Sequence, residues 1–194
     1  MTPTSGEAKV LGDSLERSSL KARAKIGYMS QKFSLYGDIS VIENLKFFAG
    51  IYGLKGKEKE TKIANMLEIF DMHRYAHTAS KDLPLGYKKR LSLACAVMHD
   101  PVVLFLDEPT SGVDPLTRRE FWNHIYAMVQ KGMTIMVTTH FMDEAEYCDR
   151  IALIYKGRAI ALDTPYNLIS RVSQDATMED AFVELIKRGE DAEA

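Results

Sequence analysis

An unbroken run of β-prone apolar residues ends in two adjacent carboxylates. Residues 102–106 read Val-Val-Leu-Phe-Leu, and Asp107 and Glu108 follow directly. Such a run is typical of a strand covered on both faces, as in a parallel sheet between layers of helices. Paired carboxylates leaving a buried strand can hold a metal ion and activate a water beside it. The same pair could instead have no role beyond capping the next turn. The neighbouring segments distinguish between these two interpretations.

The chain after these carboxylates predicts a second strand of the same sheet. Asp114 precedes a proline and starts an amphipathic helix that stops at Gly132, and residues 134–138 then form another apolar run. A strand, helix, strand unit with a right-handed crossover indicates an α/β fold. His140 follows the second strand, so it should emerge at the same sheet edge as the carboxylates, where ligand sites form. Alone it would be a surface or capping histidine; beside the carboxylates we predict that it contacts a phosphate.

Helices dominate the part of the chain before residue 100. Residues 26–29 predict a strand that stops just before Gln31, which places this side chain at a strand end. Ser40 and Glu43 form a capping box that starts the first of three successive helices. The third helix is expected to begin after Gly86. Its predicted buried stripe consists of Leu91, Ala94, Cys95 and Met98.

Composition restricts the partners and the compartment. The chain has 194 residues, 46% of them hydrophobic, which suits either one domain or a core with a small satellite subdomain. The formal net charge of -2 gives no broad cationic surface, so no nucleic-acid partner is expected. The two cysteines, Cys95 and Cys148, fall in predicted helices and suit reduced thiols in the cytosol. No run of about 18 apolar residues could span a bilayer, so a membrane role would need another subunit.

Together these motifs resemble those of ABC transporter ATPases. The segment from Asp107 to Asp114 resembles the family's Walker B and D-loop motifs, His140 resembles its switch histidine, and Gln31 resembles its Q-loop glutamine. The resemblance implies that Asp107 and Gln31 bind Mg²⁺. It implies catalytic roles for Glu108, which would position the attacking water, and for His140. It also implies that Gln31 and Asp114 contact ATP.

The signature motif of that family is altered in this chain. The family usually has Leu-Ser-Gly-Gly-Gln, followed by an arginine three residues later, where residues 83–87 here read Leu-Pro-Leu-Gly-Tyr. By position, the residues expected to contact ATP are Pro84, Leu85, Gly86 and Tyr87. Backbone N–H groups at the start of the following helix can still face a phosphate. Without the resemblance, this segment would be interpreted as a turn.

The sequence contains no phosphate-binding loop of the form Gly-x-x-x-x-Gly-Lys-Ser/Thr. Residues 53–58 come nearest, but they lack the glycine spacing and the hydroxyl, and we interpret them as a solvated turn. The resemblance therefore implies a chain truncated before the segment that begins at Thr2. We expect the isolated chain to bind Mg-ATP very weakly, because charge-assisted bonds to phosphate are missing. Loss of one sheet edge should also expose apolar side chains and reduce solubility.

The resemblance covers nearly the whole chain, from Thr4 to about Gly189. It implies an α/β fold with a P-loop NTPase-like parallel sheet core, incomplete because the N-terminal strands and phosphate loop are lacking, and with a helical subdomain. We expect four segments. These are a remnant of the N-terminal core with the Q-loop (residues 1–39), the helical subdomain with the signature region (40–99), the α/β core with Walker B, D-loop and switch histidine (100–172), and a C-terminal helix and tail (173–194).

The implied function is ATP hydrolysis, with Mg²⁺, that drives export through a partner permease. A second ABC cassette would form a head-to-tail dimer with this chain, on the cytoplasmic face of the cell membrane. The export branch is suggested by the altered signature and by residues 177–182. Phe33, Leu35 and Tyr36 are candidates for permease contacts, or equally for core residues.

Two other functions remain open. The chain could be a non-catalytic partner, or a fragment, of a complete ABC ATPase, and nucleotide binding separates this from an active subunit. It could also be a soluble ABC-type ATPase not linked to transport. The lack of a long heptad insertion and of a basic surface disfavours this third function.

Overall fold

The computed structural model describes residues 4–14, 24–173 and 175–191 and divides the chain into two compact units, Met1–Thr138 and Thr139–Ala194. The first unit contains β1 (Lys9–Val10), β2 (Asp13–Ser14), β3 (Ile26–Met29), α2 (Val41–Ile51), α3 (Gly56–Ile69), η1 (His73–Tyr75), η2 (Ser80–Asp82), α4 (Leu85–Val97), β4 (Val103–Asp107), α5 (Pro115–Gln130) and β5 (Thr134–Thr138). The second contains α6 (Met142–Ala145), β6 (Ile151–Tyr155), β7 (Arg158–Asp163), α7 (Pro165–Ser170) and α8 (Met178–Asp191).

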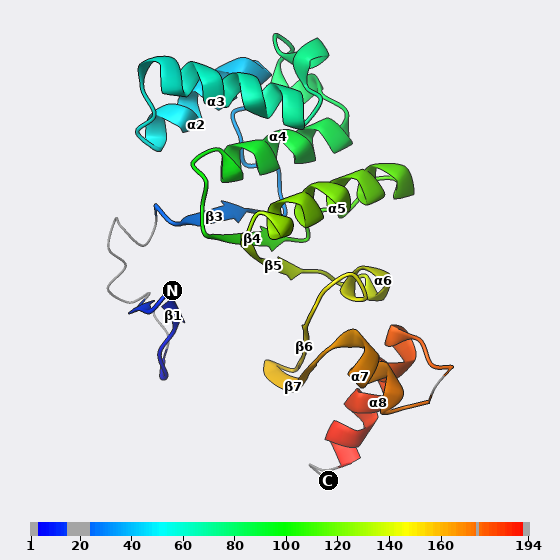
Figure 1. Ribbon diagram of the computed structural model, residues 1–194. Coiled ribbons are helices and arrows are strands. Elements are labelled where there is room, and N and C mark those ends of the chain that lie inside the picture. The colour runs from blue at the N-terminus through cyan, green and yellow to red at the C-terminus, as the bar shows by residue number, and fades with distance from the viewer. Residues whose placement is uncertain (1–3, 15–23, 174, 192–194) are drawn as a thin grey trace. The chain divides into compact units, whose positions relative to one another are not determined.

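Three parallel strands form the central sheet of the first unit, in the order β3-β4-β5. The helices all lie on one side of it. Helices α4 and α5 pack next to the strands, and α2 and α3 lie beyond α4 (Figure 1). This is the predicted parallel sheet core with a helical subdomain.

Helix α2 begins where the sequence predicts. The Ser40 side chain accepts from the backbone N–H of Glu43, and the Glu43 carboxylate accepts from the backbone N–H of Ser40. The reciprocal bonds satisfy backbone donors that a helix N-terminus otherwise leaves free. Behind this cap, Asn44 is fully buried and donates to the Ser80 hydroxyl 2.8 Å away, which fixes α2 against the segment that leads into α4.

Helix α4 is buried on most sides between Leu91 and Val97. The predicted inward stripe is buried, but Leu93, Ala96 and Val97 outside that stripe are buried as well. Gly27 of β3 permits this close packing, because a Cβ there would lie 2.5 Å from the Ala96 carbonyl oxygen. A helix buried on most sides leaves little room for charged residues in water, so those it carries near its start need partners inside the protein.

Two sequence predictions need correction. The third helix begins at Leu85, not after Gly86. The helix predicted to reach Cys148 ends at Ala145, so this cysteine lies beyond it. The apolar run of β5 is typical of a buried strand, yet Met136 is 56% exposed, in line with the apolar exposure expected from loss of a sheet edge. Helices α4 and α5 both lie on one face of the sheet (Figure 1). The described residues thus leave one sheet face open.

The second unit has a hydrophobic cluster of its own. Its antiparallel hairpin β6-β7 turns at Lys156 and Gly157, both with positive φ. Leu168 of α7 and Met178 and Ala181 of α8 are fully buried in the cluster. The Thr177 hydroxyl and the Asp180 carboxylate cap α8 reciprocally. Residues 1–3, 15–23, 174 and 192–194 of the predicted terminal segments lie outside the described residues.

Candidate functional site

The two carboxylates lie at the carboxyl edge of the sheet, as predicted. Asp107 is the last residue of β4 and pairs in register with Thr138 at the end of β5. The Thr138 hydroxyl donates to Asp107 Oδ1 over 2.6 Å, and the Glu108 backbone N–H donates to the Thr138 carbonyl oxygen over 3.0 Å. The neighbouring strand therefore fixes both the side chain of Asp107 and the backbone of Glu108.

Glu108 has an unusual backbone conformation. Its φ of 42° lies in the left-handed region, which costs a residue with a side chain on the order of 1–3 kcal/mol. Such strain persists only where the surroundings hold the residue, and it is common at active sites. The Glu108 carbonyl oxygen accepts from the backbone N–H of Ser111 at 3.2 Å and from Lys89 Nζ at 3.4 Å.

Gln31 meets Glu108 directly. Its Nε2 donates to Glu108 Oε2 over 2.6 Å, although 77 positions separate the two residues in the sequence. The parallel pairing of β3 with β4 accounts for this contact, because it brings both strand ends to one edge. Of the residues predicted from sequence, Gln31, Asp107 and Glu108 are thus gathered in one place.

Lys89 of α4 contacts the backbone of both Gln31 and Glu108. It is 7% exposed, and its Nζ donates to the Gln31 carbonyl oxygen over 2.9 Å. Burial lowers its pKa, while the carboxylates of Glu108 and Asp107 act in the opposite direction. A pocket of about 120 Å³ lies beside it, lined by Ser30, Gln31, Phe33, Leu85, Lys88, Lys89, Ser92 and Ser111. This volume is below the roughly 300–1,000 Å³ of pockets for organic ligands.

The altered signature segment forms the first turn of α4. Pro84 is the N-cap residue and provides no side-chain cap bond, and Leu85 is 45% exposed. Gly86 lies against α5, because a Cβ there would be only 2.7 Å from Thr117 Cγ2. The glycine is therefore required by packing, whatever its role toward a ligand.

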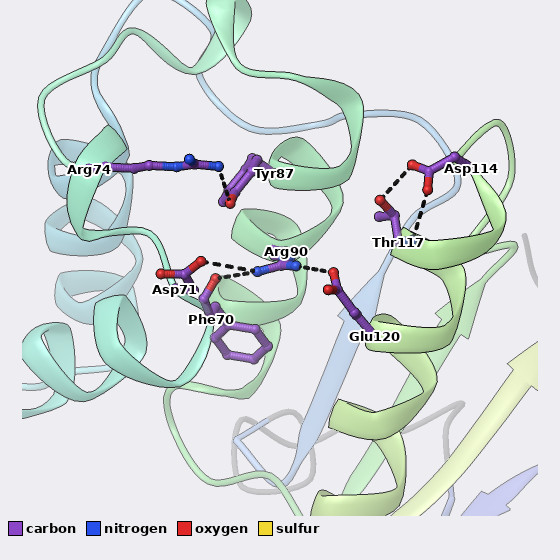
Figure 2. Close-up of polar contacts among 8 residues, drawn as sticks. All are labelled: Phe70, Asp71, Arg74, Tyr87, Arg90, Asp114, Thr117 and Glu120. Carbon is purple, nitrogen blue, oxygen red and sulfur yellow. Dashed lines mark hydrogen bonds and ion pairs between the residues drawn. The ribbon is translucent and has the colours of Figure 1, made fainter.

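Asp114 caps the helix that Gly86 touches. Its carboxylate accepts from the Thr117 backbone N–H at 3.0 Å and from the Thr117 hydroxyl at 2.6 Å, which lowers the pKa of Asp114 (Figure 2). Thr117 consequently joins the D-loop aspartate to the signature turn. Any ligand contact by Asp114 would share its carboxylate with this cap.

Two arginines hold the rest of the signature turn (Figure 2). Arg74 donates to the Tyr87 hydroxyl over 2.6 Å. Arg90, whose side chain is 12% exposed, donates to Glu120 of α5 over 2.5 Å and to the Phe70 carbonyl oxygen over 3.2 Å. Its guanidinium carbon also lies 4.9 Å from the centroid of the Tyr87 ring. Arg90 thereby links α4, α5 and the end of α3.

His140 belongs to the second unit. Its ring lies 4.2 Å from that of Phe141, between ring centroids. Its predicted contact with a phosphate beside Glu108 stays a prediction.

Lys89 and Thr138 also belong to the site, although no sequence motif singles them out. Thr138 precedes His140 by two residues and pairs with Asp107, so strand register could have identified it. The signal for Lys89 is the absence of a polar face in residues 91–97, which predicts that charges just before them are buried.

Hard oxygen donors at the sheet edge fit Mg²⁺. The Asp107 carboxylate and the Gln31 side-chain oxygen are ligand types that Mg²⁺ accepts, and Mg²⁺ usually retains several waters beside one or two protein ligands. Within residues 4–14, 24–173 and 175–191, no three His, Cys, Asp or Glu side chains are grouped to hold a metal.

The parallel sheet with its helical subdomain is the P-loop NTPase-type fold that this chain shares with solved ABC ATP-binding subunits. The sequence model of the ABC transporter family matches residues 1–111. The chain therefore belongs to the ABC transporter family, as an ATP-binding domain of that family.

Two curated relatives are ATP-binding proteins by name, one of a multidrug ABC transporter and one of Nod factor export. The probable multidrug ABC transporter ATP-binding protein YbhF of Escherichia coli (strain K12) is 59% identical over 190 residues, which cover 96% of this chain and 33% of that protein. The Nod factor export ATP-binding protein I of Cupriavidus metallidurans is 37% identical over 169 residues, which cover 87% and 56%. The chain thus spans about a third of the length of the first relative and about half of the second.

Two solved structures share the fold. An ATP-binding subunit of an ABC transporter superposes with a TM-score of 0.83 at 26% identity, over 96% of this chain and 78% of that one. The cbiO1 protein of Clostridium perfringens, described as part of the ABC transporter complex cbiONQ, gives 0.76 at 27% identity, over 88% and 70%. No helix among the described residues combines the length and the apolar character that crossing a membrane needs.

Proposed function

We propose that this chain is the ATP-binding part of an export transporter, in which ATP hydrolysis drives a partner permease. The contact of Gln31 with Glu108 at the edge of the sheet is the observation that carries the proposal. It joins the strand end before the helical subdomain to the candidate catalytic carboxylate. The name of the second relative, a Nod factor export ATP-binding protein, supports the choice of export.

Glu108 is the proposed base that orients the attacking water. Its carboxylate is held by Gln31, and its backbone by Thr138, so it needs little rearrangement before reaction. Asp107 and Gln31 would hold Mg²⁺, which neutralises charge on the phosphates when bound. His140 is proposed to contact the γ-phosphate.

ATP would be held between this chain and a second cassette in a head-to-tail dimer. The signature turn, Pro84 to Tyr87, and Asp114 would face the nucleotide bound by the partner cassette. Phe33, Leu35 and Tyr36 are proposed permease contacts, and Tyr36 is 53% exposed. The complex would lie on the cytoplasmic face of the cell membrane. We still expect the isolated chain to bind Mg-ATP very weakly, and micromolar affinity by calorimetry would contradict that expectation.

Replacing Glu108 with glutamine tests the catalytic role. In the assembled transporter, E108Q should lower ATP turnover by about 100-fold or more, because general-base catalysis contributes about 10²–10⁴-fold. Glu60→Gln on the exposed face of α3 is the matched control and should leave turnover unchanged. Turnover by E108Q within about threefold of the unmodified complex would refute the assignment. Co-purification of the chain with a membrane permease tests the transport role separately.

A non-catalytic partner is the second candidate function. Pro84 favours it, because this residue lacks the hydroxyl that the signature serine offers and provides no side-chain cap for α4. P84S should supply a cap worth about 1 kcal/mol, measurable in urea denaturation. If P84S raises turnover of the assembled complex, the proline weakens an active site. A complex that binds ATP but hydrolyses none, with or without P84S, is a non-catalytic one.

A further inference from the structure

We propose that Lys89 is a positioning residue. Its ammonium group fixes the positions of Gln31 and Glu108 relative to each other through their backbone carbonyls. This inference rests on the proposed function, since it assigns Lys89 a role in ATP hydrolysis. Its basis is a ring of contacts. Lys89 Nζ donates to the carbonyl oxygens of Gln31 and Glu108, and the side chains of those two residues bond to each other over 2.6 Å.

Because Lys89 is buried, its hydrogen bonds are needed to compensate for the lost hydration of its ammonium group. A buried ammonium loses its hydration and persists only where acceptors replace the water. Lysine has three N–H donors, and two of them here reach backbone carbonyls of two separate loops. The charge is therefore used to hold backbone in place rather than to pair with one carboxylate.

Glu108 needs such support more than its neighbours do. Its positive φ is unfavourable for a residue with a Cβ, so the loop after β4 would relax if its carbonyl lost a partner. Relaxation would turn the carboxylate away from Gln31. Lys89 thus supports the strained residue on which the proposed chemistry depends.

The position of Lys89 also connects two motifs. It lies two residues after Tyr87, in the second turn of the helix that begins with the signature segment. A displacement of α4 would move the ammonium, and with it the carbonyls of both loops. A ligand at the signature turn would in this way affect the geometry of Gln31 and Glu108.

Hydrogen exchange tests the structural link in the whole chain. Lys89→Met keeps the length of the side chain and removes its donors, and it should speed exchange in residues 30–36 and 107–113 by about tenfold. The hairpin of β6 and β7 should keep its exchange rates, which separates local loosening from unfolding. Lys57→Met, on the exposed surface of α3, is the control and should change neither segment. Unchanged exchange in both segments of K89M would overturn the proposal.

Kinetics of the assembled transporter test the catalytic consequence. K89M should lower kcat by about 10–100-fold with KM nearly unchanged, because misplacing a reacting group affects the chemical step. Lys89→Arg keeps a cation with donors and should recover part of kcat, whereas a role in stability alone would leave kcat unchanged once the protein is folded. Faster exchange with an unchanged kcat would refute the positioning role. If the unmodified complex hydrolyses no ATP, the proposed function is wrong. The hydrogen-exchange measurement alone then tests whether Lys89 holds the loops of Gln31 and Glu108.

Discussion

Replacing Arg90 with methionine should weaken the attachment of α4 to its neighbours. The guanidinium is 12% exposed and donates to Glu120 and to the Phe70 carbonyl oxygen, and it lies over the ring of Tyr87 (Figure 2). Methionine fills a similar volume but offers no donor. The variant therefore tests the polar contacts while largely preserving the packing.

The expected loss follows from three contributions. A hydrogen bond from a charged donor to a buried carbonyl contributes about 1.5–3 kcal/mol. The ion pair adds about 0.5–1 kcal/mol, because Glu120 is 44% exposed and water screens its charge. The contact with Tyr87 adds about 0.5–1 kcal/mol. Release of the cost of burying the guanidinium offsets part of the sum, so we expect a loss of about 2–3 kcal/mol in the free energy of unfolding.

Urea denaturation followed by circular dichroism measures this loss. Arg119→Met is the matched control, since Arg119 is exposed on α5 and should change stability by less than about 0.5 kcal/mol. A double-mutant cycle with Glu120→Gln should give a coupling of about 0.5–1 kcal/mol. A loss below about 0.5 kcal/mol for R90M, together with no coupling, would show that Arg90 does not fasten α4.

Other changes test the packing and the buried groups. Gly27→Ala should lower the free energy of unfolding by about 1–3 kcal/mol through overpacking. Gly50→Ala in α2, where a Cβ meets only Lys59 Nζ at 3.8 Å, should raise it by up to about 1 kcal/mol. The denaturation midpoints of the two variants check both expectations. Burial lowers the pKa of His99 and of His124, so the unfolded chain binds protons first and stability should fall as pH drops below about 6.5. Replacing both with glutamine should flatten that dependence, and an unchanged slope would exclude them as its source. Burial raises the pKa of Cys95, so its thiol should resist a thiol-labelling reagent until urea unfolds the chain, and rapid native labelling would contradict the buried position.

Local signals predicted most of the fold. The capping box at Ser40 and the apolar run before Asp107 each depend on a few adjacent residues, and the structure contains both. The exposure of Met136 does not follow from its own apolar run and was expected only from the loss of a sheet edge. Burial of a strand depends on what covers each face, and an apolar run does not say whether helices cover one face or two.

The site was predictable where strand order determines it. Asp107, Glu108 and Gln31 come together because parallel strands end at one edge. Lys89 was not predicted, because its role depends on how deeply α4 is buried, a tertiary property. Arg90 matched the family pattern, yet its partners Glu120 and the Phe70 carbonyl follow only from the packing of three helices.

Three consecutive residues of α4 point in three directions. Lys88 Nζ lies 5.9 Å from the centroid of the Phe33 ring, Lys89 reaches Gln31, and Arg90 reaches Glu120. Successive residues of a helix differ by about 100° in direction, so inserting one residue before Lys88 would redirect all three. Inserting four would restore their directions but shift each by about 6 Å along the axis. The start of α4 should therefore tolerate short insertions and deletions poorly, even though Leu85 in its first turn is exposed.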